Sequence, residues 1–72
     1  MLEQNTVTEM MPVLPEVIEV MRANNYRVHD RIQKASGAFL SGRNMNTVLM
    51  VGSKEGLEVA RRMLLQLVSR DQ

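Results

Sequence analysis

The sequence predicts a single α+β domain whose elements follow the order strand, helix, helix, strand, strand, helix. Residues 47–51 form a continuous apolar run, which is typical of a strand at the centre of a sheet. Apolar residues recur at helical spacing in residues 15–23, 26–36 and 54–69. Proline, asparagine and glycine separate these segments and favour turns. The length of 72 residues is that of one small domain.

The chain is expected to begin with a short strand and a helix. Residues 6–11 alternate weakly and are rich in β-branched residues, which favours a strand ended by Pro12. The next helix is predicted over Pro15–Ala23, because a proline at the first helical position loses no hydrogen bond. Asn24 and Asn25 then end this helix, since asparagine tolerates the left-handed conformation in which helices often end.

A second helix is predicted over Tyr26–Ser36, followed by Gly37 as its end. Three apolar residues at positions i, i+4 and i+7 share one stripe of this helix: Val28, Ile32 and Ala35. Three basic residues have the same spacing one position earlier: Arg27, Arg31 and Lys34. They therefore form a parallel basic stripe about 100° around the helix.

The second half of the chain predicts two strands and a final helix. A strand is expected to start at residues 38–40, followed by a turn-rich connection over residues 41–46. The apolar strand over residues 47–51 comes next. Ser53 can cap the last helix, which we expect over residues 54–69.

The final helix has more apolar residues than one small sheet can cover. Its core stripe is expected to contain Leu57, Ala60, Leu64, Leu67 and Val68. Three further apolar residues widen that stripe: Val59, Met63 and Leu65. A surplus of this kind often marks an interface, so the three residues are candidates for contact with a protein partner or a second copy of the chain.

The composition argues against catalysis and against a metal site. The chain has no cysteine and a single histidine, His29, which we expect to be solvated. Nothing in the sequence combines a nucleophile, a base and an orienting group, so we expect no enzyme, no cofactor and no metal. No apolar run is long enough to span a membrane, and the absence of cysteine fits an intracellular, cytoplasmic protein.

The net charge of +1 conceals an uneven distribution. Residues 1–21 carry four acidic side chains and no basic one, whereas residues 22–43 carry five basic side chains and one acidic one. A basic middle segment of this kind can face a phosphate backbone or form a solvated surface. The chain contains only two aromatic residues, Tyr26 and Phe39, so a surface of stacked aromatic rings is not expected.

Two stretches resemble the K homology (KH) domain of the eukaryotic type I. The last third is similar to the family's strand–turn–helix signature, with Val48-x-Met50-x-Gly52-Ser53-x-Glu55-x-Leu57-x-x-Ala60. Upstream, the family's segment around a helix end is matched by Ile32-Gln33-Lys34-x-Ser36-Gly37-Ala38-Phe39-Leu40. The resemblance spans roughly residues 6–69, which we take as one KH-like domain with flexible ends at residues 1–5 and 70–72. It implies a βααββα fold in which three helices cover one face of a three-stranded antiparallel sheet.

The resemblance also implies binding of single-stranded RNA, or support for RNA binding by neighbouring domains. The family's GxxG loop clamps the phosphates of about four nucleotides. Here that loop would fall at residues 22–25, where neither glycine is present. The chain is therefore most similar to degenerate KH-like domains, as in tandem proteins of the Bicaudal-C type. We expect the RNA contacts to come from Arg22, Asn24, Asn25, Arg27, Arg31, Lys34 and Arg43. Five aliphatic residues could line the groove or form core: Val20, Met21, Val28, Ile32 and Leu40.

Two other functions remain open at this point. One is a protein-interaction or oligomerisation domain that uses the final helix and a strand edge. The other is a small ferredoxin-like regulator that senses a ligand, because residues 37–51 are slightly similar to a nucleotide-sensing trimer. That similarity is short, and it needs a longer first strand than residues 6–11 provide.

Overall fold

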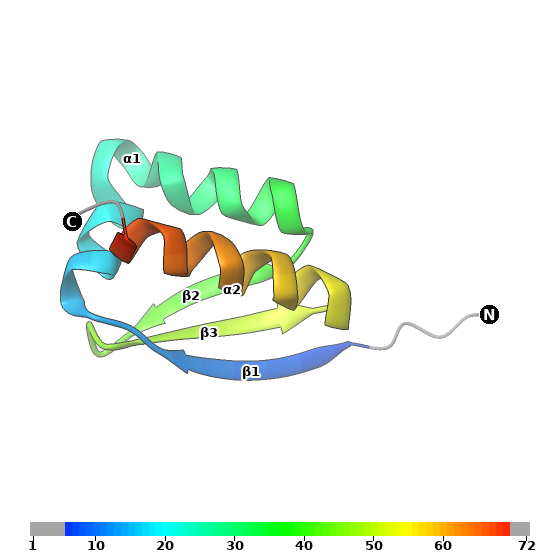
Figure 1. Cartoon of the computed structure of the whole chain (residues 1–72). Helices are drawn as coiled ribbons and strands as arrows, with labels where there is room; N and C mark the ends of the chain where they lie inside the picture. The colour runs from blue at the N-terminus through cyan, green and yellow to red at the C-terminus, as the bar shows by residue number, and fades with distance from the viewer. Residues whose placement is uncertain (1–5, 70–72) are drawn as a thin grey trace.

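The computed structural model describes residues 6–69, and the ends expected to be flexible lie outside this range. Five elements follow one another along the chain: β1 (Val7–Pro12), α1 (Pro15–Ser36), β2 (Phe39–Arg43), β3 (Thr47–Gly52) and α2 (Lys54–Ser69). The strands form one antiparallel sheet in the order β1-β3-β2, and both helices cover the same face of it (Figure 1). The predicted α+β class and the antiparallel three-stranded sheet are therefore confirmed.

The apolar run over residues 47–51 is the middle strand, as predicted. Met50 of β3 lies opposite Glu9 of β1 on one side and Leu40 of β2 on the other. Val48 and Met50 point toward the helices and have no exposed surface. The residues that alternate with them, Leu49 and Val51, are only partly exposed because strands flank them on both sides, so apolar side chains suit both faces of this segment.

A single hydrophobic core lies between the sheet and the two helices. It contains residues from every element except β1, and from the loop before β2: Val17, Ile18, Met21, Ile32, Ala38, Leu40, Val48, Met50, Leu57, Ala60 and Leu64. Among residues 6–67 no polar or charged residue is buried. Four of the expected core residues of the last helix, Leu57, Ala60, Leu64 and Leu67, pack in or against this core.

The number of helices corrects the expectation. We expected three helices, and the structure has two, because the segment predicted as two helices forms one element, α1. Four residues within α1 have non-helical backbone dihedrals, from Ala23 to Tyr26. Asn24 and Asn25, the predicted end of a helix, lie in this break in the left-handed conformation. Figure 1 shows α1 bending there, so that its second half runs beside α2.

Strand β2 is longer than expected. The sequence predicted a turn-rich connection over residues 41–46, but Ser41–Arg43 belong to β2 and pair with β3. Only residues 44–46 form the turn. The pairing with β3 decides the structure here, because a buried neighbouring strand offers hydrogen bonds that outweigh the turn preference of Ser41 and Gly42.

The end of α1 is as predicted. Gly37 adopts the left-handed conformation, with φ of 74°, and its N–H donates to the carbonyl of Gln33 at 2.8 Å. Glycine suits this position because it has no Cβ to oppose a positive φ. The cap directs the chain from α1 into β2 and thereby sets the distance between the second half of α1 and the edge of the sheet.

Candidate functional site

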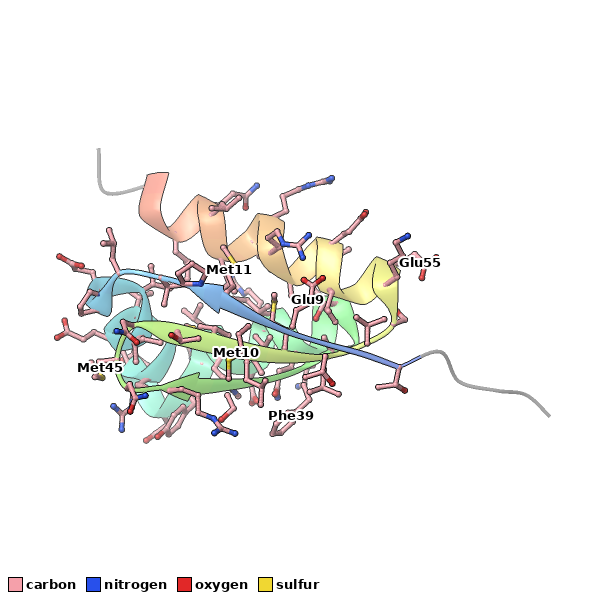
Figure 2. All side chains as sticks on the ribbon, turned by 90° about the horizontal axis from the view of Figure 1, so that it is seen from below. Glu9, Met10, Met11, Phe39, Met45 and Glu55 are labelled. Atoms are coloured by element: carbon pink, nitrogen blue, oxygen red, sulfur yellow. The ribbon has the colours of Figure 1, made fainter. Side chains whose placement is uncertain are left out.

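A hollow of about 420 Å³ lies between α1, on both sides of its break, the outer edge of β2 and the turn that follows β2. We call it the groove. Its lining combines apolar and polar residues from three parts of the chain: Ile18, Met21, Arg22, Tyr26, His29, Leu40, Ser41, Gly42, Asn44 and Met45. Met45 lines the groove from the β2–β3 turn, where Figure 2 shows its side chain. A mixed lining of this kind suits a ligand with both flat apolar and polar surfaces.

The wall of the groove is fixed by two side chains of α1 that bind the edge of β2. His29 Nε2 donates to the carbonyl of Leu40 at 2.8 Å, and the N–H of Leu40 donates to Gln33 Oε1 at 2.9 Å. The ring of Tyr26 stands edge-on to that of His29, with the ring centroids 5.8 Å apart. His29 is half-buried in this position, so the expectation of a solvated histidine is wrong. The physical reason is that an edge strand leaves backbone groups to be satisfied.

These two bonds reveal how the rest of β2 is oriented. Backbone groups of successive residues in an antiparallel strand point alternately toward and away from the paired strand. Because Leu40 bonds to α1, its N–H and C=O point away from β3, and those of Gly42 must do the same. Gly42 lines the groove, and no side chain among residues 6–67 bonds to its backbone. The groove therefore contains one open donor and one open acceptor on a strand edge.

A second, wide hollow of about 720 Å³ lies on the other side of the break in α1. It is lined by Asn24, Asn25, Arg27, Asp30, Arg31, Lys34 and Ala35. The predicted basic stripe is thus present as one surface, together with both asparagines of the break. Three cationic side chains and one carboxylate leave this surface with a net positive charge. We call it the basic face.

The break between the groove and the basic face has an unusual backbone. Asn24, Asn25 and Tyr26 all have positive φ values, of 55°, 60° and 64°. For residues with a Cβ this conformation costs roughly 1–2 kcal/mol each, and less for asparagine. Such strain persists only where the surrounding fold holds it in place, and it often occurs at functional sites.

The structure separates two of the predicted RNA contacts from the basic face. Arg22 lines the groove instead, where its Nη1 approaches Met45 Sδ at 3.5 Å. Arg43 lines neither hollow, and it lies in β2 at a position that alternates with Leu40 and Gly42. Its side chain therefore belongs to the sheet face that the helices leave open.

The five aliphatic groove candidates also divide. Met21 and Leu40 line the groove from the core side. Val28 and Ile32 face α2 instead, across a small cavity shared with Met63 and Leu67. Val20 is exposed and lines neither the groove nor this small cavity. Sequence reasoning missed the other seven residues of the groove: Ile18, Tyr26, His29, Ser41, Gly42, Asn44 and Met45. Their place in the groove depends on β2 being at the edge of the sheet.

The three residues proposed as an interface on the final helix do not form one surface. Met63 packs against the core on the side of α1. Leu65 is 54% exposed and borders a different hollow, formed with Met11–Leu14 of the segment between β1 and α1. Residues two positions apart in a helix differ by about 200° around its axis, so Met63 and Leu65 point to opposite sides. Val59, 38% exposed, lies one turn from Met63.

Two observations concern metal ions and the membrane. Among residues 6–67, no three histidine or carboxylate side chains gather where they could hold a metal ion. Neither α1 nor α2 is long and apolar enough to cross a membrane.

No model of a known protein family matches the chain, and no curated protein matches it. The geometry of the groove and the basic face must therefore carry the functional argument.

Proposed function

We propose that the chain is a non-catalytic, KH-like module that binds single-stranded RNA in the groove, with the phosphates held toward the basic face. In this proposal α1 and its break correspond to the two helices and the connecting loop of a KH domain. The observation that carries the proposal is the groove itself. It places open backbone groups of Gly42 opposite a strained loop that is bordered by cationic side chains.

The chemistry of both surfaces supports a single strand rather than a duplex. The groove is a narrow hollow between a helix and a strand edge, and it can take a flat base whose edge meets the N–H and C=O of Gly42. The basic face lies across α1 from the groove, because Arg31 and Gln33 differ by about 200° around the helix. Its cations, Arg27, Arg31 and Lys34, can neutralise the phosphates of a strand that continues from the groove around the break. In a duplex the Watson–Crick edges are already paired, so they cannot bond to the backbone of Gly42.

The absence of glycine at the break lowers the affinity that we expect. In a KH domain the glycines allow phosphates to approach the backbone closely. The side chains of Asn24 and Asn25 occupy that space here. Arg22, which reaches into the groove, supplies one positive charge on its inner side. We therefore expect weak binding that depends strongly on salt.

The experiment is a titration of fluorescent single-stranded RNA of random sequence with the full chain at several salt concentrations. The logarithm of the affinity should fall linearly with the logarithm of the salt concentration, with a slope of about −0.7 for each neutralised phosphate. The double substitution Arg27→Gln and Arg31→Gln should weaken binding and make this slope shallower by about 0.7 per lost contact. Arg62→Gln is the matched control, because Arg62 is exposed on α2 away from both surfaces.

Three results would contradict the proposal. The first is no binding at low salt. The second is equal weakening by Arg62→Gln, which would indicate attraction to charge alone. The third is equal affinity for double-stranded RNA. An NMR titration adds a positional test, because the amide signal of Gly42 should shift on binding while that of Val51, on the open face of the sheet, should not.

A further inference from the structure

The two edges of the sheet differ in whether their backbone groups are occupied. The outward N–H and C=O of Leu40, on the β2 edge, are bonded to Gln33 and His29. The register then determines which groups of β1 are free. On the β2 side, the backbone groups of β3 bond to Phe39, Ser41 and Arg43. The β3 residues in between direct their backbone groups to the other side, where they bond to Val7, Glu9 and Met11 of β1.

The remaining residues of β1, Thr8 and Met10, therefore direct their N–H and C=O away from the sheet. No side chain among residues 6–67 hydrogen-bonds to the backbone of either one. Natural proteins usually protect such an edge with a charged side chain or a proline. The one charged residue of β1, Glu9, instead points to the helix side, where it pairs with Arg61 of α2 (Figure 2). Pro12 protects only the end of the strand.

We propose that β1 pairs antiparallel with β1 of a second copy of the chain, around a two-fold axis at Glu9. In this register Thr8 of each copy lies opposite Met10 of the other copy, so two such pairs form. Each pair exchanges two hydrogen bonds, so all four outward groups on each strand are used. An axis at Met10 would pair Thr8 with Pro12, which has no N–H. An axis at Thr8 would pair Met10 with Thr6, which lies before β1.

The side chains beside this edge are complementary to themselves, as a two-fold interface requires. On the open face of the sheet, Met10 is 62% exposed and would cover the Thr8 side chain of the other copy. On the helix side, each copy presents one carboxylate and one guanidinium, Glu9 and Arg61, which are 45% and 39% exposed. This register places the two Glu9 side chains directly opposite each other, and the Arg61 that pairs with each one offsets the repulsion between the two carboxylates. The apolar hollow bordered by Leu65 flanks the same edge.

A single cysteine tests the register directly, because the chain has none of its own. At the axis, Glu9→Cys brings two Cα atoms to about 4.5 Å, the spacing of a non-hydrogen-bonded antiparallel pair and within the range for a disulfide. Met10→Cys is the matched control. Its two Cα atoms would be about 9 Å apart, too far for a disulfide. The proposal predicts a covalent dimer for Glu9→Cys and little for Met10→Cys in oxidised glutathione.

The control is demanding because Met10 is the more exposed of the two residues. Random collision would therefore favour the dimer of Met10→Cys, and that result would overturn the proposal. Sedimentation equilibrium of the unmodified chain should show a dimer that dissociates on dilution between millimolar and micromolar concentration. A monomer at every concentration would also overturn it.

A backbone variant separates this edge from other surfaces. Thr8→Pro removes one outward N–H and no bond within the sheet, so the chain should fold and remain a monomer. Thr8→Val keeps the N–H and should still dimerise. If Thr8→Pro fails to fold by circular dichroism, Met10→Lys serves in its place, because a lysine on an edge opposes pairing. A folded variant of either kind that still dimerises as the unmodified chain does would refute pairing through β1.

Discussion

Replacing Gly56 with alanine tests the contact between the end of α1 and the start of α2. Gly56 lies in the first turn of α2, beside the end of α1. A Cβ at this position would lie 2.6 Å from the carbonyl oxygen of Ser36 and 3.1 Å from Ser53 Oγ. The obstacle is backbone and cannot rotate away. The end of α1 is also fixed, because Ser36 Oγ donates to the carbonyl of Ile32 and accepts from the N–H of Ala38.

Two opposing effects decide the sign of this change. Alanine stabilises the interior of a helix by about 0.5–1 kcal/mol relative to glycine. Forcing an added methyl group into a packed contact costs about 1–3 kcal/mol. Because the clash is with a fixed carbonyl, we expect the cost to win and Gly56→Ala to lower the free energy of unfolding by about 1–2 kcal/mol. For a domain of this size each kcal/mol lowers the melting temperature by about 4–8 °C.

The assay is thermal and urea unfolding followed by circular dichroism, with a matched pair of controls in the same helix. Glu58 is exposed on α2, so the comparison of Glu58→Gly with Glu58→Ala measures the helix preference alone. Alanine should be the more stable of the two there. If Gly56→Ala also raises the melting temperature, α2 does not press on the end of α1, and the reasoning from this contact is refuted.

Two further predictions concern the groove. Asn24→Gly with Asn25→Gly should change the free energy of unfolding by less than about 1 kcal/mol, because relief of the positive φ values offsets the greater freedom of unfolded glycine. RNA affinity should rise about tenfold, the equivalent of one new hydrogen bond to a charged group, whereas the two alanine substitutions should give no gain. His29→Ala should cost about 1–3 kcal/mol in urea unfolding, because the carbonyl of Leu40 loses its partner. An unchanged stability would mean that water replaces the imidazole without loss.

The sequence was most informative where a pattern depends on burial alone. The apolar run over residues 47–51 identified the middle strand, and the spacing of Leu57, Ala60 and Leu64 identified the core face of α2. The spacing of Arg27, Arg31 and Lys34 likewise placed three cations on one surface. These periodicities are local, so they do not require knowledge of which elements are neighbours.

Features that depend on the neighbouring element could not be predicted in the same way. Ser41 and Gly42 have the composition of a turn, and only the pairing with β3 makes them a strand. Arg43 belongs by charge to the basic middle segment, but the alternation along β2 places its side chain on the open face of the sheet. The contact of His29 with Leu40 depends on the strand order β1-β3-β2, which leaves β2 at the edge.

The break in α1 depends partly on the local sequence and partly on a tertiary contact. Asn24 and Asn25 indicated where the helix is interrupted, since asparagine accepts a positive φ. Tyr26 has no such preference, yet its φ is 64°. Its ring lies against His29, so a tertiary contact accompanies a conformation that the residue type does not favour. The same contact places Tyr26 in the groove and not on the solvated side of the helix.

The two proposals use opposite edges of the sheet and therefore do not compete. RNA would lie along the β2 edge, which is joined to α1 at Leu40, and a second copy would pair with the open β1 edge. A dimer would form one six-stranded sheet with a groove at each end, about 24 Å apart across five strand spacings. A strand of about four nucleotides would reach only one of these grooves. Dimerisation would thus leave the affinity for short RNA unchanged and increase that for RNA long enough to occupy both grooves, because the second site then binds at a high effective concentration.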